Sequence, residues 1–462
     1  MKHINLSVNR TYSCDVLVIG GGVAGISAAI CAARNGACVI LTEREGCLGG
    51  TASVGLVGPF MSAMDPTGQT QVIRGFFDDF VGRMVEAGGA VHPKDCGGGI
   101  GYSAYRIKGH IGVTPFDPEC LKLTAEKMCE EAGVKLLYHM LLCSCEKSGD
   151  TITSAIFMTK NGLYEINAKV FIDCTGDADL AVFSGAPTVF GDENGHTQVS
   201  SVFFTIDGVD KTLLQTHVDR YPENTHKTQR YLEDVIREAQ VARTFPCGRS
   251  RVSAFESVGG VWRVNMTQYD KQIDFADPEG VTEAEITCRK QIHPLIDFLK
   301  KNVPGFANIR LLQSANTLGV RESRRIDGEH MLSIEDLKNG TQFEDAICVV
   351  GSAVDFHSSQ KPDGSYDGKY YVAGEHPMQV PYRCLQPKKV ENLLVAGRCV
   401  SADQLTHSAI RVMPPCFAMG EAAGSAAALS VKTGTPVKQI NIKQLQTLLR
   451  KNGAYLPEGL LP

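Results

Sequence analysis

One stretch near the amino terminus constrains the fold more than any other part of the chain. It reads CDVLVIGGGVAGISAAICAARNGACVILTERE and starts at Cys14. The apolar, β-branched run at residues 14–19 indicates a buried strand, and the small residues after the glycines indicate a helix packed closely on it. A second apolar run at residues 38–42 predicts another strand. The stretch therefore predicts a strand–helix–strand unit of a parallel sheet.

The turn between the first strand and the helix has the spacing G-x-G-x-x-G. It is formed by Gly20, Gly22 and Gly25, and Glu43 follows the second strand. In such a unit the first glycine makes the turn, the second lets the backbone approach a pyrophosphate, and the third allows the helix to pack closely. The acid after the second strand binds ribose hydroxyls. Together these features favour a dinucleotide site over a structural glycine turn.

Composition and charge exclude several other classes of protein. The chain has 462 residues, 43% of them hydrophobic and 21% charged, which is typical of a soluble protein with two domains. Its net charge of −5 argues against a nucleic-acid surface. Because there is no long apolar run and no apolar segment near the start, we expect no membrane span, no signal peptide and a cytoplasmic location.

The sixteen cysteines are scattered along the chain, and none forms a C-x-x-C motif. This absence argues against ferredoxin-type clusters and zinc ribbons, and reduced thiols are the better interpretation. His330 and His376 each have a glutamate beside them, but neighbours in sequence point apart. The sequence therefore predicts no metal site.

Two later stretches also carry signals for ligand binding. In VFIDCTGDADLA, Thr175, Gly176 and Asp179 follow a predicted strand, and α/β sheets bind ligands at the carboxyl ends of their strands. In THSAIRVMPPCFAMGEAAG, Pro414 and Pro415 predict a helix that begins near residue 416. A helix start attracts anions through its free amides and its dipole.

Taken in order, the motifs resemble the FAD-dependent oxidoreductase family of the glutathione-reductase-like FAD superfamily, over nearly the whole chain. They are G-x-G-x-x-G with Glu43, LGGTAS, FDPE, IDCTGDADLA, LGVRESRRIDGEH, VAGRCVSAD and HSAIRVMPPCFAMGEAAG. The resemblance implies that FAD is the cofactor. It also implies that the start of the helix after Pro414 and Pro415 is directed at the flavin. The cofactor-binding residues that it implies are Gly20, Gly22, Gly25, Glu43, Arg44, Gly49, Gly50, Thr51, Thr175, Gly176, Asp179, Gly397, Arg398, Arg411, Val412 and Met413.

The chain differs from related flavoproteins at positions that bear on how electrons reach the flavin. Ala52 and Val57 stand where disulfide reductases of the superfamily carry redox cysteines, so we expect electrons to pass through the flavin alone. No second nucleotide-binding unit is recognisable. The glycine-rich loop DCGGGIGYSAYR, at residues 95–106, is interpreted as a lid rather than a nicotinamide site.

The predicted fold class is α/β, with a discontinuous Rossmann-like FAD-binding domain that contains a three-stranded β-meander, and an inserted α+β substrate domain. Residues 1–197 form the first part of the FAD-binding domain, in which 55–115 are a lid or a substrate-facing insertion. Residues 198–388 form the substrate domain. Residues 389–462 complete the FAD-binding domain and end in a helical tail.

Two candidate catalytic residues lie in the HSAIR segment, which resembles the H-G-A-N-R of fumarate-reductase-type flavoproteins. By this analogy His407 contacts the substrate, and Arg411 contacts the substrate or a flavin carbonyl. The alternatives are that His407 caps a turn and that Arg411 binds a backbone carbonyl.

A cluster of arginines and an acid–imidazole pair are further candidates. Of Arg321, Arg324 and Arg325, at least two are expected to form salt bridges with Glu322, Asp327 or Glu329, whereas Arg321 is assigned to the substrate. Asp355 and His357 have the spacing of an acid–base pair, although a turn capped by the aspartate is favoured.

The sequence thus predicts an FAD-dependent oxidoreductase that transfers hydride to or from a small organic molecule. Its electron donor or acceptor and its oligomeric state are not specified by the sequence. Two alternatives stay open: a flavoenzyme without net redox change, such as an epimerase or hydratase, and an electron-transfer subunit without its own substrate.

Overall fold

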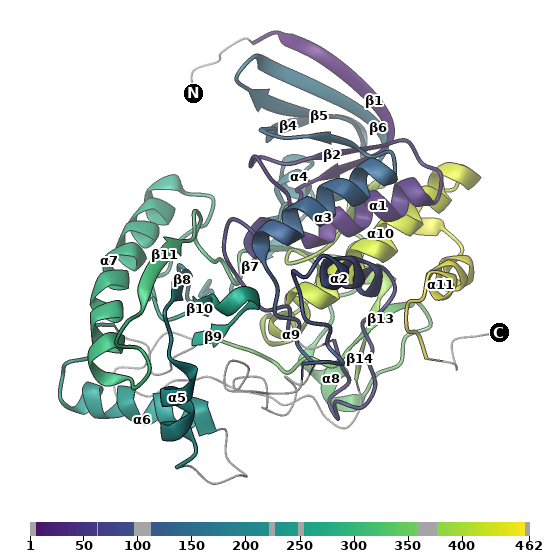
Figure 1. Cartoon of the computed structure of the whole chain (residues 1–462). Helices are drawn as coiled ribbons and strands as arrows, with labels where there is room; N and C mark the ends of the chain where they lie inside the picture. Colours follow the sequence, from purple (N-terminus) through teal and green to yellow (C-terminus); the bar gives the residue numbers. More distant parts are fainter. Residues whose placement is uncertain are drawn as a thin grey trace.

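The computed structural model describes residues 6–61, 63–96, 112–220, 227–247, 254–357 and 377–457. These residues form an α/β protein in which a large, mainly parallel sheet with helices lies beside a smaller antiparallel sheet with its own helices (Figure 1). No helix in these ranges is long and apolar enough to cross a membrane. All sixteen cysteines are described, and each is a free thiol.

The large sheet has seven strands, in the order β3-β2-β1-β6-β5-β4, with β15 paired to β6. The parallel strands are β1 (Val8–Ile19), β2 (Val39–Thr42), β3 (Lys135–Leu137), β6 (Gly162–Asp173) and β15 (Leu393–Val395), and the antiparallel strands are β4 (Leu141–Ser148) and β5 (Thr151–Thr159). Ile19 pairs with Thr42 and Asp173, and Val395 pairs with Asp173. The carboxyl ends of four strands therefore meet at one edge.

The α/β fold with its parallel sheet confirms the predicted fold class, with one difference in detail. The predicted β-meander and the predicted strand before CTGDADLA were treated as separate elements. In the structure both belong to β6, which pairs with β5 on one side and with β1 on the other. The meander is therefore continuous with the parallel sheet.

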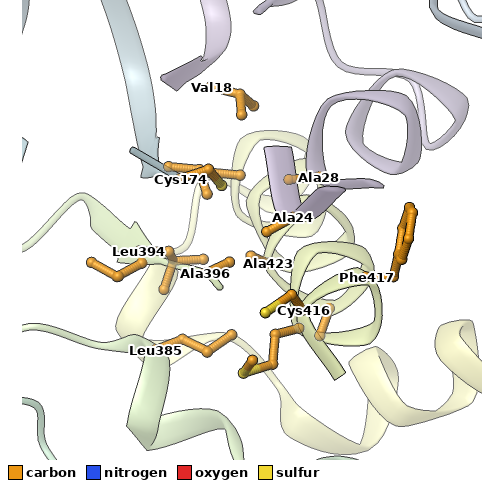
Figure 2. Packing of buried hydrophobic residues seen from close by; sticks show 14 of the residues in the cluster. Val18, Ala24, Ala28, Cys174, Leu385, Leu394, Ala396, Cys416, Phe417 and Ala423 are labelled. Atoms are coloured by element: carbon orange, nitrogen blue, oxygen red, sulfur yellow. The ribbon is translucent and has the colours of Figure 1, made fainter. Parts of the chain in front are cut away.

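Two long helices pack against each other behind the sheet. They are α1 (Val23–Arg34) and α10 (Met413–Thr433). A Cβ on Gly420 would lie 2.2 Å from the Ala24 carbonyl oxygen, and one on Gly424 would lie 2.1 Å from that of Ala28. Only glycine permits this contact, which brings both helix starts to the edge where the strands end (Figures 1 and 2).

Further helices and two pairs of antiparallel strands complete the first core. They include α2 (Phe76–Glu86), α3 (Pro118–Glu131), α4 (Asp179–Phe183), α8 (Ile334–Asn339), α9 (Gln404–Ile410) and α11 (Ile442–Lys451), with paired strands β7 (Thr188–Phe190) and β12 (Arg324–Ile326), and β13 (Ala346–Val350) and β14 (Met378–Pro381). Figure 2 shows Phe417 of α10 on the side of that helix away from Leu394 of β15. Its ring packs on the rings of Phe76 and Phe80 from α2.

The second core lies under the smaller sheet, whose strand order is β11-β8-β10-β9. Its strands are β8 (Phe204–Asp207), β9 (Ala254–Glu256), β10 (Trp262–Val264) and β11 (Arg310–Ser314), accompanied by α5 (Lys211–Val218), α6 (Lys227–Val241) and α7 (Pro278–Asn302). Trp262 and Phe306 pack edge to face at its centre.

The two cores suggest a shorter substrate domain than the predicted 198–388. The second core contains buried residues up to Leu318, whereas Ile326, Ile347 and Val380 belong to the first. We therefore propose that the substrate domain ends near residue 320. Within the predicted insertion at 55–115, α2 belongs to the first core, and residues 97–111, which include most of the predicted lid, lie outside the described residues.

A buried carboxyl group on α10 leads to a prediction about stability. Oε2 of Glu421 accepts a hydrogen bond from the Phe76 amide at 3.0 Å, and burial raises the pKa of Glu421 to about 8. Because this pKa is higher than in the unfolded chain, the free energy of unfolding should fall as pH rises from about 5 to 8, by up to about 1.4 kcal/mol per pH unit. Glu421→Gln should remove this component, so the variant should match the wild type near pH 5 and exceed it near pH 8. Urea unfolding at several pH values tests the difference, and parallel curves for both proteins would contradict it.

Candidate functional site

A cavity of about 430 Å³ is lined by residues of both cores and of the segments between them. One part, here called the glycine-loop compartment, is lined by residues at the carboxyl ends of the parallel strands, including Gly22, Glu43 and Gly397. The other part, the cap compartment, is lined by residues from the second core and its borders, including Phe203 and Asn265. The two parts are continuous.

Glycine is needed at each position of the G-x-G-x-x-G turn for a different steric reason. A Cβ on Gly20, whose φ is +98°, would lie 2.5 Å from the Cys174 carbonyl oxygen. A Cβ on Gly25 would lie 1.8 Å from the Gly20 carbonyl oxygen, so this glycine allows the helix to pack. Gly22 differs because a Cβ there would meet no atom within 4 Å and Gly22 lines the cavity. A ligand can therefore approach the backbone at Gly22.

Glu43 reaches from the end of β2 to the glycine turn. Its Oε2 accepts a hydrogen bond from the Gly21 amide at 2.6 Å, and its Oε1 accepts one from the Glu45 amide at 2.8 Å. Burial raises the pKa of Glu43, and its side chain lines the cavity. Arg44 also lines the cavity and lies 3.6 Å from the carboxylate of Glu45.

The LGGTAS motif is tied to the same turn. The Gly49 amide donates to the Gly21 carbonyl at 2.8 Å, and the φ of Gly49 is +111°. Gly50 and Thr51 then line the cavity, whereas Gly49 does not. Gly49 therefore stabilises the glycine turn through this hydrogen bond and does not itself contact the cavity.

The turn after β6 is organised by a residue that the sequence analysis did not single out. Asp173 is fully buried and accepts hydrogen bonds from the Thr175 amide and hydroxyl at 3.0 and 2.7 Å, and from the Ala181 amide at 3.0 Å. Thr175, Gly176 and Asp179 line the cavity. The three hydrogen bonds to Asp173 hold this turn in place.

Arg398 joins this turn to the far end of the chain. Its guanidinium donates to Asp177 and to the Ser323 hydroxyl, both at 2.9 Å. Burial alone would raise the pKa of Asp177, but Arg398 and Ser323 outweigh it and the pKa is lowered. Burial, with nearby carboxylates, raises the pKa of Asp179 to about 6. Asp177 and Ser323 were also missed, because their partners are distant in sequence.

The second helix start opens onto the same cavity. α10 begins at Met413, three residues before the predicted start, with Pro414 and Pro415 in its first turn. Val412 precedes the helix and provides no side-chain cap, and Val412, Met413 and Cys416 line the cavity. This helix start therefore borders the cavity and has no side-chain cap for its free amides.

His407 does not occupy the place expected from the H-G-A-N-R analogy. The ring is fully buried and does not line the cavity, and its Nε2 lies 2.6 Å from the Arg398 carbonyl oxygen. Burial, together with the nearby Arg325 and Arg411, lowers the pKa of His407 well below its ordinary value. A neutral, enclosed imidazole positions Arg398, so this placement argues against substrate contact by His407.

Arg411 does face the cavity, beside the acid–imidazole pair. Its Nη2 donates to the Asp355 carbonyl at 2.9 Å and to Oε1 of Gln198 at 3.3 Å, whereas its Nε is buried without a partner among the described residues. Nε2 of His357 lies 3.0 Å from Oδ1 of Asp355. Arg411, Asp355 and His357 all line the cavity. The sequence analysis favoured a turn capped by Asp355, but the structure pairs Asp355 with His357.

Of the three arginines of the LGVRESRRIDGEH motif, Arg325 is the one that pairs with a predicted partner among the described residues. Arg321 lines the cavity and donates to the Val199 carbonyl at 2.6 Å. Arg324 pairs with Asp179, and Arg325 pairs with the buried Glu322. The predicted partners Asp327 and Glu329 instead pair with Lys388 and Lys438.

Comparison with known proteins decides the family. The family described as FAD dependent oxidoreductase matches residues 15–449. The chain belongs to this family. FAD is therefore its cofactor, as the motifs predicted, and the chain is an FAD-dependent oxidoreductase.

Individual relatives are more distant. A 4-oxocyclohex-2-ene-1-carboxylate 5-dehydrogenase of Sinomonas cyclohexanicum is 46% identical over 54 residues, which are 12% of this chain and 9% of that protein. The structure of a geranylgeranyl bacteriochlorophyll reductase-like protein of Thermoplasma acidophilum has a TM-score of 0.48 at 12% identity, covering 96% of this chain and 85% of that one. That of p-nitrophenol 4-monooxygenase of Pseudomonas putida has a TM-score of 0.49 with the same identity and coverage.

The residues that line the glycine-loop compartment are suited to binding FAD. The open face of Gly22 and the uncapped start of α1 suit a pyrophosphate, and Glu43 at the end of β2 suits the adenosine ribose. Gly397 and Arg398 also line the cavity, as does the start of α10, which has no side-chain cap and suits a negatively charged reduced flavin.

Proposed function

We propose that this oxidoreductase transfers hydride between FAD and a small organic molecule bound in the cap compartment. The observation that carries the proposal is the continuity of the two compartments, which supports binding of a substrate beside the flavin. When bound, FAD accepts or returns two electrons with one proton.

The lining of the cap compartment supports a substrate with an apolar body and a polar end. Phe203 and Phe255 supply apolar surface, and Asn265 supplies an amide. Arg411 and Arg321 contribute positive charge, which can hold a carboxylate or stabilise an oxygen that gains negative charge. These side chains orient the reacting carbon and exclude water from it.

An electron-transfer subunit without its own substrate is a weaker alternative. Such a protein needs an exposed flavin edge for its partner, whereas Phe203 and Phe255, which line the cap compartment, are 6% and 7% exposed. A lined compartment of this kind supports a bound small molecule.

An anaerobic spectral titration tests the proposal. The FAD-loaded protein is mixed with a panel of alcohols, amines and hydroxy acids, and the photoreduced protein with activated alkenes and carbonyl compounds. At least one compound should bleach or restore the visible flavin absorbance in a saturable manner. If only other redox proteins exchange electrons with the flavin, the electron-transfer alternative replaces the proposal.

A further inference from the structure

We propose that the substrate is a carboxylate, and that Arg411 binds its carboxylate group while another carbon of the molecule reacts with the flavin. This inference deepens the proposed function and rests on it, because it names the class of the molecule bound in the same cavity. The Arg411 side chain is 11% exposed and lines the cavity. A molecule bound there can therefore reach a guanidinium that is otherwise buried.

Arg411 donates no hydrogen bond to a carboxylate among the described residues. Its Nη2 donates to two uncharged acceptors, the Asp355 main-chain carbonyl at 2.9 Å and Oε1 of Gln198 at 3.3 Å. Oδ2 of Asp355 lies 3.9 Å from Nη2, which is beyond hydrogen-bond distance. The Nε of Arg411 is buried and has no partner in the same part of the chain. A cation in this state has lost hydration without gaining a bonded anion, so an anionic ligand would stabilise it.

The acids around Arg411 are bonded to other groups. Oε1 of the buried Glu322 pairs with Arg325, and its Oε2 accepts from the Gln198 amide at 3.1 Å. Oδ1 of Asp355 lies 3.0 Å from Nε2 of His357. Burial lowers the pKa of Arg411, although Asp355 and Glu322 act in the opposite direction. The neighbouring acids therefore do not offset the cost of burying this guanidinium.

Gln198 supplies a second donor without an acceptor, on a side chain bonded to the same guanidinium. It is 1% exposed, and its Oε1 accepts from Arg411 and from the His357 amide at 3.2 Å. Its Nε2 is buried and has no partner among the residues that the structure describes. Negative charge beside this pair of side chains would be stabilised by hydrogen-bond donors that are already in place.

The first test compares carboxylates with uncharged molecules of the same shape. Binding of benzoate, phenylacetate and cyclohexanecarboxylate to the FAD-loaded protein is measured by isothermal titration calorimetry near neutral pH, each beside its own amide. Their rings suit the apolar surface of Phe203 and Phe255, which line the same cavity. At least one carboxylate should bind about tenfold more tightly than its amide, because charge-assisted hydrogen bonds to arginine are strong. Equal affinities within every pair, or no binding of any carboxylate, overturn the proposal.

The second test changes the charge beside Arg411 without changing the volume. Gln198→Glu keeps Oε1 and replaces a donor that has no acceptor with a charged oxygen. The new carboxylate would neutralise Arg411, so affinity for the preferred carboxylate should fall about 30-fold, while affinity for its amide changes less than about threefold. Arg411→Met should give the same loss, and Arg411→Lys should keep part of the preference because it keeps the charge but not the planar fork. Arg310→Met is the matched control, since Arg310 is exposed, pairs with Asp207 and lies outside the cavity lining.

Equal equilibrium dialysis measurements of FAD separate the substrate from the flavin as the partner of Arg411. A preference for carboxylates that persists in both Gln198→Glu and Arg411→Met overturns the proposal. If Arg411→Met also binds FAD at least tenfold more weakly while keeping that preference, the guanidinium serves the flavin instead. These results would leave the proposed function standing, since its failure would appear as the absence of electron exchange with any molecule of the compound panel.

Discussion

Replacing Gly22 with alanine is expected to remove FAD from the protein while the chain stays folded. The new methyl group would meet no protein atom within 4 Å, and the φ of Gly22 is −68°, so the backbone is not strained. The methyl group would instead occupy the space where the pyrophosphate approaches the turn. We expect the Kd for FAD to rise at least 100-fold, or ~2.7 kcal/mol, as measured by equilibrium dialysis.

Gly82→Ala is the matched control for this experiment. Gly82 lies within α2, and a Cβ there also meets no atom within 4 Å, but Gly82 does not line the cavity. This variant should bind FAD like the wild type and gain up to about 1 kcal/mol of stability from its higher helix propensity. If Gly22→Ala retained FAD with unchanged affinity, the assignment of the glycine turn to the pyrophosphate would be wrong.

Asp173→Ala is expected to have the largest effect on stability. Three donors, the Thr175 amide and hydroxyl and the buried Ala181 amide, would lose their acceptor. Since hydrogen bonds to charged groups contribute about 1.5–3 kcal/mol each and do not add fully, we expect a loss of about 3–5 kcal/mol in the free energy of unfolding. The turn that carries Thr175 and Gly176 would also loosen, so FAD affinity should fall.

The amide variant Asp173→Asn distinguishes lost hydrogen bonds from lost volume. It keeps one oxygen that can accept from Thr175, but its amide nitrogen would face the Ala181 amide. Urea unfolding should therefore give a loss between those of the wild type and Asp173→Ala. A loss below about 1 kcal/mol in the alanine variant would show that Asp173 does not organise this turn.

The FAD cradle could be predicted from the sequence because its signals are local. The three glycines and Glu43 fall within one strand–helix–strand unit whose spacing depends on backbone geometry alone. The start of α10 was predicted to within three residues because two prolines can stand together only in a first helical turn.

The chemistry of the cap compartment depends on contacts between distant segments. Nothing in the sequence indicates that Gln198 binds both His357 and Arg411, or that His407 is turned to the Arg398 carbonyl. For this reason the sequence favoured His407, which lies in the HSAIR segment, over His357, which lies in no recognisable motif. The D-F-H spacing was the available signal for the acid–imidazole pair, since alternate residues of an extended segment share a face.

The substrate is proposed to bind in the cap compartment, and a bulky side chain that fills this compartment tests the proposal. Thr317 lines the cavity, whereas its neighbour Asn316 is exposed and does not. A compound from the panel that reduces the wild-type flavin should reduce Thr317→Trp at least tenfold more slowly in anaerobic stopped flow. FAD content and ferricyanide reoxidation should be unchanged, and Asn316→Trp should behave like the wild type. Reduction of Thr317→Trp at the wild-type rate would contradict the claim and place the substrate elsewhere.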